Sequence, residues 1–289
     1  MFGRIVVGYT SDQAGRDAVS LAARLAAPLD CRMTVAFPYH ALLSSVTAAE
    51  AEERVAVEVR ELLDGLAGLQ PPVFHWTPSS WPIRGLHELA RHERAGLIVF
   101  GSARERLADR LHVSLMERMV HGAPCAVAVA PAHHSDGGPR QLQRIGVGFS
   151  TSPEGRAALD VARRLATLLE CQVELIAGVG LEPTLASYAF ASPALAEIEQ
   201  EMHAETAANL ERLASELGEG PAVEHRVVEG DPATVLVERS AELDLLVLGS
   251  RAYGPVRHVL LGSVSASAMR EAHCPVMVIP RGSQPPADP

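Results

Sequence analysis

Aromatic residues and long apolar runs are both scarce in this 289-residue chain. Only 4% of the residues are aromatic while 47% are hydrophobic, and alanine, valine and leucine carry the apolar share. Such a composition is typical of helices packed on buried parallel strands. No apolar stretch approaches the ~20 residues that a membrane-spanning helix needs, and the first residues show no leader-like pattern. We therefore expect a cytoplasmic protein that does not enter membranes.

Positive charge is also in deficit. The chain has 25 basic against 35 acidic residues, a formal net charge of −10. Because affinity for polyanions comes mainly from clustered basic side chains, we do not expect a nucleic-acid partner.

The four cysteines show no CxxC spacing and each adjoins a strand-like run: Cys31, Cys125, Cys171 and Cys274. This pattern favours buried reduced thiols, with a disulfide or a metal role as the alternative.

Catalytic signatures are absent as well. The run from Gly146 to Thr151 starts like a dinucleotide fingerprint but ends on threonine. The sequence contains no GxxxxGK[ST] loop, no adenylyl-transferase HxGH, no pyrophosphatase SGGxDS, no GxSxG and no HExxH. We therefore expect a binding protein and no dedicated enzyme, with slow hydrolysis of a bound ligand left open.

The chain does contain an internal repeat. Placing each residue opposite the one 140 positions later aligns Ile5 with Ile145 and Gly8 with Gly148, and nine of seventeen positions are identical between 15–31 and 155–171. The apolar runs LIVFGS and LLVLGS each end on a Gly-Ser pair, in the first and the second half respectively. Self-similarity of this kind indicates a duplicated unit.

Each half alternates short strands with amphipathic helices, which predicts right-handed βαβ units. We expect an α/β fold of two open, doubly wound parallel five-stranded sheets, each with strand order 3-2-1-4-5 and helices on both faces. The predicted strands are 4–9, 31–37, 72–77, 96–101 and 125–130, then 144–149, 171–178, 222–228, 244–249 and 274–279. The predicted helices are 12–29, 48–68, 83–94 and 114–122, then 153–169, 194–218, 232–242 and 263–272.

The predicted domains are 1–131 and 143–282, joined by a linker at 132–142 and followed by a disordered tail at 283–289. The linker AHHSDGGPRQL is rich in glycine and polar residues and has no apolar periodicity. Its pair His133-His134 is either half of a metal site or a solvated pair. The second interpretation is favoured because no cysteine or carboxylate cluster accompanies the pair.

The loop after the fourth strand of the second half carries the clearest chemical pattern. In parallel sheets ligands bind beyond the carboxyl ends of the strands. Here Gly249 allows a sharp turn, Gly262 removes a side chain where a phosphate would approach, and Ser263 and Ser265 offer hydroxyls and amides at a helix N-terminus. A polyphosphate cradle is one interpretation; the other is a strand-ending turn at Gly249 and an N-cap at Ser263.

This loop resembles that of the universal stress protein family, whose ATP-binding members carry Gly-x2-Gly-x9-Gly followed by Ser or Thr. Gly249, Ala252, Gly262 and Ser263 fit that spacing, with alanine for the second glycine. The resemblance extends through IVVGY, IGVGF, the turn at 230–232 and the closing strand HCPVMV. It implies a five-stranded α/β domain, often duplicated in tandem, and a stress-response or regulatory protein.

For the ligand, the resemblance implies ATP, with or without Mg, in the second half. The implied binding residues are Gly148, Phe149, Ser150, Ala177, Gly249, Arg251, Ala252, Gly262, Ser263, Val264 and Ser265. The alternative is a structural or protein-interaction member with vestigial loops. One departure is that Ser150 stands where ATP-binding members usually have an aspartate near the adenosine.

In the first half the loop is degenerate, because Arg104 and Val113 replace the second and third glycines. Thr10 stands at the aspartate position, and Asp12 is either a substitute for it or an N-cap. We therefore do not expect ATP in the first half. The resemblance also implies that the two fifth strands pack together across a pseudo-twofold axis, and a homodimer of such tandems is a further arrangement.

Overall fold

The computed structural model describes residues 2–39, 47–78, 82–102, 116–137, 141–180, 193–216, 220–250 and 262–280. In the first half the elements are β1 (Arg4–Gly8), α1 (Gln13–Ala26), β2 (Arg32–Tyr39), α2 (Ala48–Leu63), β3 (Val73–Pro78), α3 (Pro82–His92), β4 (Leu97–Gly101) and β5 (Ala126–Ala130). Residues 116–120, within the fourth predicted helix, are also helical. Each predicted strand of this half is present to within two residues.

The second half repeats this order after a short 3-10 helix, η1 (His134–Gly137). Its elements are β6 (Arg144–Gly148), α5 (Pro153–Leu169), β7 (Gln172–Val179), α7 (Pro193–Glu216), β8 (Val223–Glu229), α8 (Pro232–Arg239), η2 (Ser240–Glu242), β9 (Leu245–Gly249), α9 (Ser263–Glu271) and β10 (Val276–Ile279). The helix predicted over 232–242 is divided into α8 and η2, and the Ser240 hydroxyl at the junction accepts a hydrogen bond from the amide of His273 (2.8 Å).

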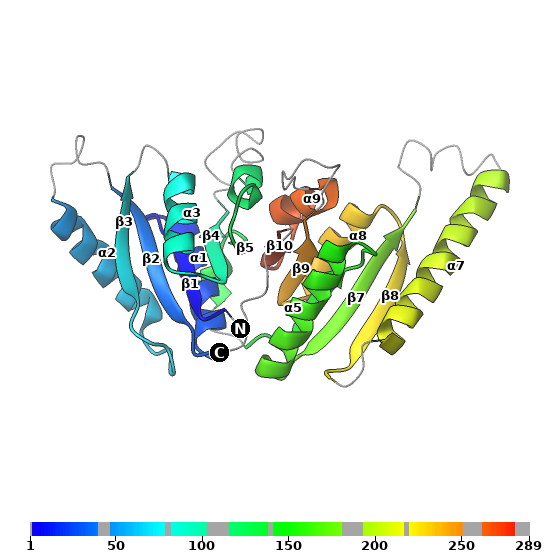
Figure 1. The fold of residues 1–289 in the computed structure, drawn as a ribbon, viewed down its shortest axis with the longest axis horizontal. Coiled ribbons are helices and arrows are strands. Elements are labelled where there is room, and N and C mark those ends of the chain that lie inside the picture. Colours follow the sequence, from blue (N-terminus) through cyan, green and yellow to red (C-terminus); the bar gives the residue numbers. More distant parts are fainter. Residues whose placement is uncertain are drawn as a thin grey trace.

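The ten strands form one sheet (Figure 1) in the order β3-β2-β1-β4-β5-β10-β9-β6-β7-β8. Each half has the predicted order 3-2-1-4-5, and the two five-stranded sheets are joined into one. β5 and β10 pair antiparallel, with Val129 opposite Val276 and Val127 opposite Val278. The predicted pairing of the fifth strands is thereby confirmed. The pairing also removes two sheet edges that would otherwise be open to aggregation.

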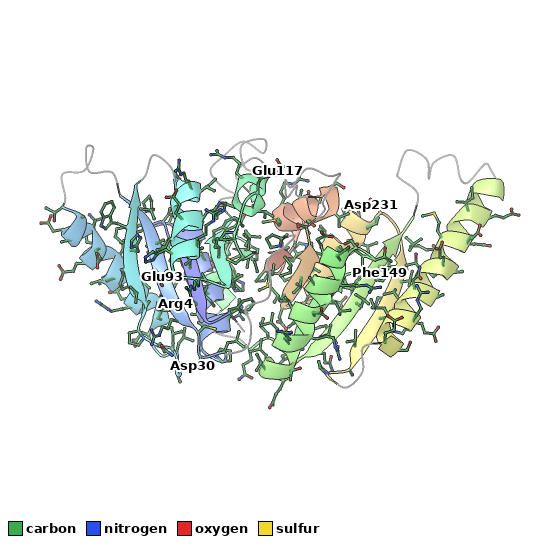
Figure 2. The ribbon with its side chains drawn as sticks, viewed as in Figure 1. Arg4, Asp30, Glu93, Glu117, Phe149 and Asp231 are labelled. Atoms are coloured by element: carbon green, nitrogen blue, oxygen red, sulfur yellow. The ribbon has the colours of Figure 1, made fainter. Side chains whose placement is uncertain are left out.

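Helices cover both faces of the sheet, as the alternation predicted. Ile5 and Val7 of β1 belong to a buried cluster that includes α1 residues such as Leu21, whereas Val6 belongs to a second cluster with Leu86 of α3. Successive strand residues point to opposite faces, so each strand contributes to both clusters. An ion pair between Arg4 and Glu93 lies at the amino end of β1 (Figure 2).

All four cysteines are buried free thiols, which confirms that prediction. Burial raises the pKa of Cys125 to about 12 and that of Cys171 to about 11. A thiol is nucleophilic and binds metal only as the thiolate, so these side chains act as small apolar residues at neutral pH.

The predicted linker is more ordered than its composition indicates. Its residues 132–137 and 141–142 are described, and they include η1. The buried carboxylate of Asp17 accepts hydrogen bonds from the amides of His133 (3.0 Å) and Ser135 (2.8 Å). Nε2 of His134 lies 2.9 Å from the guanidinium of Arg24. The prediction of a solvated histidine pair therefore holds for exposed His133 and is wrong for His134. The tail at 283–289 lies outside the described residues.

Candidate functional site

A pocket of about 220 Å³ opens at the carboxyl ends of the strands in the second half. Segments far apart in the sequence line it: the end of β6 with the loop that follows, the end of β7, one residue of α7, the start of α8, the end of β9 and the start of α9. The lining residues are Gly148, Phe149, Ser150, Ser152, Ile176, Ala177, Gly178, Thr206, Pro232, Leu236, Leu248, Gly249, Ser250, Gly262, Val264 and Ser265.

The loop after β6 is held by its own hydrogen bonds. The amide of Phe149 donates to the carbonyl of Ile176 (2.7 Å), which extends the pairing of β6 with β7. The Ser150 hydroxyl accepts from the amide of Ser152 (3.2 Å), and the Ser152 hydroxyl accepts from the amide of Gly155 (3.1 Å) as the N-cap of α5. Both serine hydroxyls therefore order the pocket wall, which both residues line.

Gly249 is the last residue of β9, and the structure shows why glycine is required at this position. A Cβ at this position would lie 2.6 Å from the carbonyl carbon and oxygen of Glu154 in the first turn of α5. The φ angle of Gly249 is not positive, so what requires glycine here is this close approach to α5. Gly101 is its counterpart in the first half, where a Cβ would overlap the Ala14 carbonyl in α1. Both glycines allow a helix to pack against the end of a strand.

The start of α9 forms the opposite wall. Gly262 is the N-cap of α9 and Ser263 is its first helical residue, so the alternative that Ser263 is the cap is wrong. As a glycine, Gly262 has no side chain to cap the first amides of the helix. The first amides of a helix have no intrahelical acceptors, so an uncapped N-terminus favours anions. The Ser265 hydroxyl donates to the carbonyl of Gly249 (3.2 Å), which ties α9 to the end of β9.

Eight of the eleven predicted site residues line this pocket: Gly148, Phe149, Ser150, Ala177, Gly249, Gly262, Val264 and Ser265. Ser263 is the first helical residue of α9 and is outside the lining. Arg251 and Ala252 lie outside the described residues.

The remaining lining residues were not predicted from the sequence. Pro232 had a readable signal in the sequence, because it belongs to the Gly-Asp-Pro turn at 230–232. In the structure this turn lies close to the end of β7: a Cβ on Gly178 would lie 2.5 Å from the Cα of Pro232. Thr206 had none, because it is one position in a long helix and only the tertiary fold brings α7 to the pocket.

The lining is electrically neutral within the described part of the chain. It offers hydroxyls, amides and apolar side chains but no ionisable group. An anion held here would therefore be bound by α9 amides and serine hydroxyls.

The corresponding loop of the first half is arranged differently. Tyr9 takes the place of Phe149, is 2% exposed, and donates its hydroxyl to Glu58 of α2 at 2.7 Å. Burial and this carboxylate raise the pKa of Tyr9 well above its usual value. Asp12 is the N-cap of α1 and accepts from the amide of Gly15 (3.0 Å), which confirms that interpretation. The side chains of this loop are thus engaged within the first half itself.

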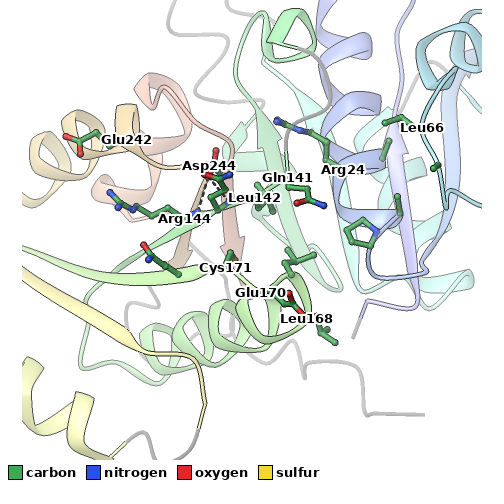
Figure 3. A pocket seen from close by; sticks show the side chains of 17 residues that line it. Arg24, Leu66, Gln141, Leu142, Arg144, Leu168, Glu170, Cys171, Glu242 and Asp244 are labelled. Carbon is green, nitrogen blue, oxygen red and sulfur yellow. Dashed lines mark hydrogen bonds between the residues drawn. The ribbon is translucent and has the colours of Figure 1, made fainter.

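A larger cavity of about 1080 Å³ lies between the halves, at the amino ends of the strands (Figure 3). It is bounded by the C-terminal ends of α1 and α5 and by the segment from 141 to 144. There the Asp244 carboxylate accepts from the amides of Gln143 (2.8 Å) and Arg144 (2.9 Å). Because ligands of open parallel sheets bind at the carboxyl ends of the strands, the smaller pocket is the candidate site.

Two further features are absent from the part of the chain that the structure describes. None of the helices there combines the length and the hydropathy required to cross a bilayer. Nor do three histidine, cysteine, aspartate or glutamate side chains come together there in a group that could hold a metal ion.

The Universal stress protein family matches residues 1–131 and 141–280. The chain belongs to this family. A universal stress protein of Mycobacterium tuberculosis strain H37Rv is 27% identical over 304 aligned residues, which cover 96% of this chain and 99% of that protein. A universal stress protein of Archaeoglobus fulgidus has a similar structure, with a TM-score of 0.62, 16% identity and coverage of 98% of this chain and 100% of that one. A putative universal stress protein of Pseudomonas aeruginosa gives a TM-score of 0.60 at 17% identity, covering 96% and 94% of the two chains.

Proposed function

We propose that this universal stress protein binds ATP in the pocket of its second half and acts as a regulatory protein in the stress response. One observation carries the proposal. The pocket brings the loop after β6 and the apolar end of β7 to the start of α9, a helix whose N-cap Gly262 makes no side-chain capping bond.

The chemistry of the walls fits the parts of a nucleotide. Ile176, Leu236 and Leu248 supply apolar surface for an adenine ring, while Ser150 and Ser152 supply hydroxyls for a ribose. The amides at the start of α9 suit a phosphate. Pockets that enclose a whole drug-sized ligand measure about 300–1,000 Å³. At about 220 Å³ this pocket would enclose the base and ribose and leave the outer phosphates and their Mg²⁺ towards solvent.

A second candidate function is that of an interaction protein without nucleotide. The neutral lining favours it, because Ser150 stands at the position of the expected aspartate and no cation is among the described lining residues. We propose binding without dedicated catalysis. Release of ADP during prolonged incubation with Mg-ATP measures any slow hydrolysis.

Isothermal calorimetry on nucleotide-stripped full-length protein tests the proposal. Mg-ATP should give saturable binding heat with the wild type. Gly262→Asp should abolish it, because a carboxylate at the N-cap repels phosphate and caps the amides that would hold it. Val113→Asp is the matched control, since it places the same charge in the corresponding loop sequence of the first half, and it should bind like the wild type. No heat with the wild type, or full binding by Gly262→Asp, would refute the proposal.

A further inference from the structure

The outer helix α7 carries an apolar row that ends at the pocket. α7 runs along the outer flank of the sheet beside β8 (Figure 1). Only Leu210 among its described side chains is fully buried. Towards the N-terminus Ile198 and Met202 remain 47% and 40% exposed. They lie four residues apart and Thr206 lies four further on, so the three share one row on the helix surface. Thr206 lines the pocket.

A row of carboxylates runs beside this apolar row. Glu197, Glu201 and Glu205 are also spaced by four residues, and all three are exposed. Where the chain is described, no ion pair involves any of them. An exposed apolar row bordered by unpaired charge of one sign is typical of a surface that binds an amphipathic helix of opposite charge.

We propose that α7 is a docking surface for a cationic amphipathic helix of a partner protein. Ile198 and Met202 would contact its apolar side, and Glu197, Glu201 and Glu205 would pair with its basic residues. A second copy of α7 does not fit, because the helix contains six glutamates and one arginine and two copies would repel each other.

The position of Thr206 connects this surface to the ligand. A nucleotide that contacts Thr206 would alter the packing or mobility of α7 and so change the affinity of the docking row. This coupling rests on the proposed function, whereas docking itself does not.

Binding of a labelled helical peptide made of leucine and lysine, followed by fluorescence anisotropy without nucleotide, tests the docking surface. The double variant Ile198→Ser/Met202→Ser should weaken binding by about tenfold, which is what loss of one to two buried apolar contacts gives. Val57→Ser is the matched control: Val57 is also 47% exposed, on the acidic helix α2, and its loss should change nothing. A peptide of leucine and glutamate should not bind.

The glutamate row gives an independent readout. Glu197→Gln/Glu201→Gln/Glu205→Gln should weaken binding and reduce its salt dependence, with unchanged circular dichroism. Absence of binding by the wild type, equal weakening by Val57→Ser and the α7 variants, or equal binding of the acidic peptide would each overturn the proposal.

Adding Mg-ATP tests the coupling. The peptide affinity of the wild type should change on saturation with nucleotide, and Thr206→Val should remove that change. If calorimetry shows that ATP binds and the peptide affinity stays constant, the coupling is wrong. If calorimetry shows no ATP binding, the proposed function fails while the nucleotide-free assay still decides the docking surface.

Discussion

The carboxylate of Asp17 accepts hydrogen bonds from both the amide and the hydroxyl of Ser135, each at 2.8 Å. Asp17 lies on α1 and is fully buried, whereas Ser135 lies in η1 between the two halves. The second half has Ala157 at the position of Asp17, so this anchor exists once per chain. It fixes the path of the connection between the duplicated units.

Asp17→Ala should lower the free energy of unfolding by about 2–3 kcal/mol, because it leaves partly buried hydrogen-bond donors without their charged acceptor. Urea denaturation followed by circular dichroism measures the change. Asp160→Ala removes an exposed carboxylate from α5 and should cost less than about 0.5 kcal/mol. Equal effects of the two substitutions would show that Asp17 does not anchor the connection.

Gly101→Ala and Gly249→Ala should each destabilise the protein by about 1–3 kcal/mol, because a Cβ at either site meets the backbone of the helix packed against it in the same half, α1 or α5. Thermal denaturation tests this. Gly137→Ala is the control, since a Cβ there meets nothing within 4 Å. If only Gly249→Ala destabilised the protein, the packing explanation for the paired glycines would be wrong.

The stability should fall as the pH drops from about 6.5 to about 4 because of His134. Burial and the neighbouring Arg24 lower the pKa of His134 to about 4, below the unfolded value of about 6.5. The unfolded chain then binds more protons in this window, so stability is lost at up to about 1.4 kcal/mol per pH unit on going down.

The variant His134→Gln should flatten this part of the pH profile, measured by urea denaturation at several pH values. The matched change His133→Gln, at an exposed site, should leave the slope as it is. A slope that survives in His134→Gln would assign the pH dependence to other groups.

Glu174→Gln should cost about 3 kcal/mol of stability. The side chain is 3% exposed and accepts from Arg239 (3.0 and 3.1 Å) and Arg226 (2.8 Å). Burial alone would raise the pKa of Glu174, but the two guanidinium groups outweigh it and lower the pKa. Loss of the charge leaves the partly buried Arg239 with the more exposed Glu242 as its remaining carboxylate partner. Glu224→Gln on exposed β8 is the control and should be near neutral. The stabilising contribution of Glu174 is present above the pKa of the unfolded state and is lost as the pH falls from that value through the lower pKa of the folded state.

Much of the fold followed from local patterns. Short valine-rich strands alternating with amphipathic helices predicted both halves, because period and length are encoded within each segment. The joining of β5 to β10 depended on the family resemblance. Nothing local in those strands distinguishes an edge from an interior position.

The features that sequence reasoning missed depend on contacts between distant segments. Asp17 and Ser135 are separated by 118 residues, so composition alone suggested a loose linker. Gly249 was interpreted as a turn, since the approach of Glu154 is visible only in three dimensions. Thr206 lines the pocket from α7. The spacing of apolar residues in a helix predicts which of its faces is buried, but not which part of the protein that face contacts.

Photolabelling with 8-azido-ATP followed by peptide mapping tests the central claim most directly, because it reports where the nucleotide lies as well as whether it binds. Label should appear, and be competed by unlabelled ATP, on peptides that contain 148–152, 176–178 or 206, which line the pocket of the second half. Label confined to first-half peptides, or labelling that excess ATP does not reduce, would contradict the account.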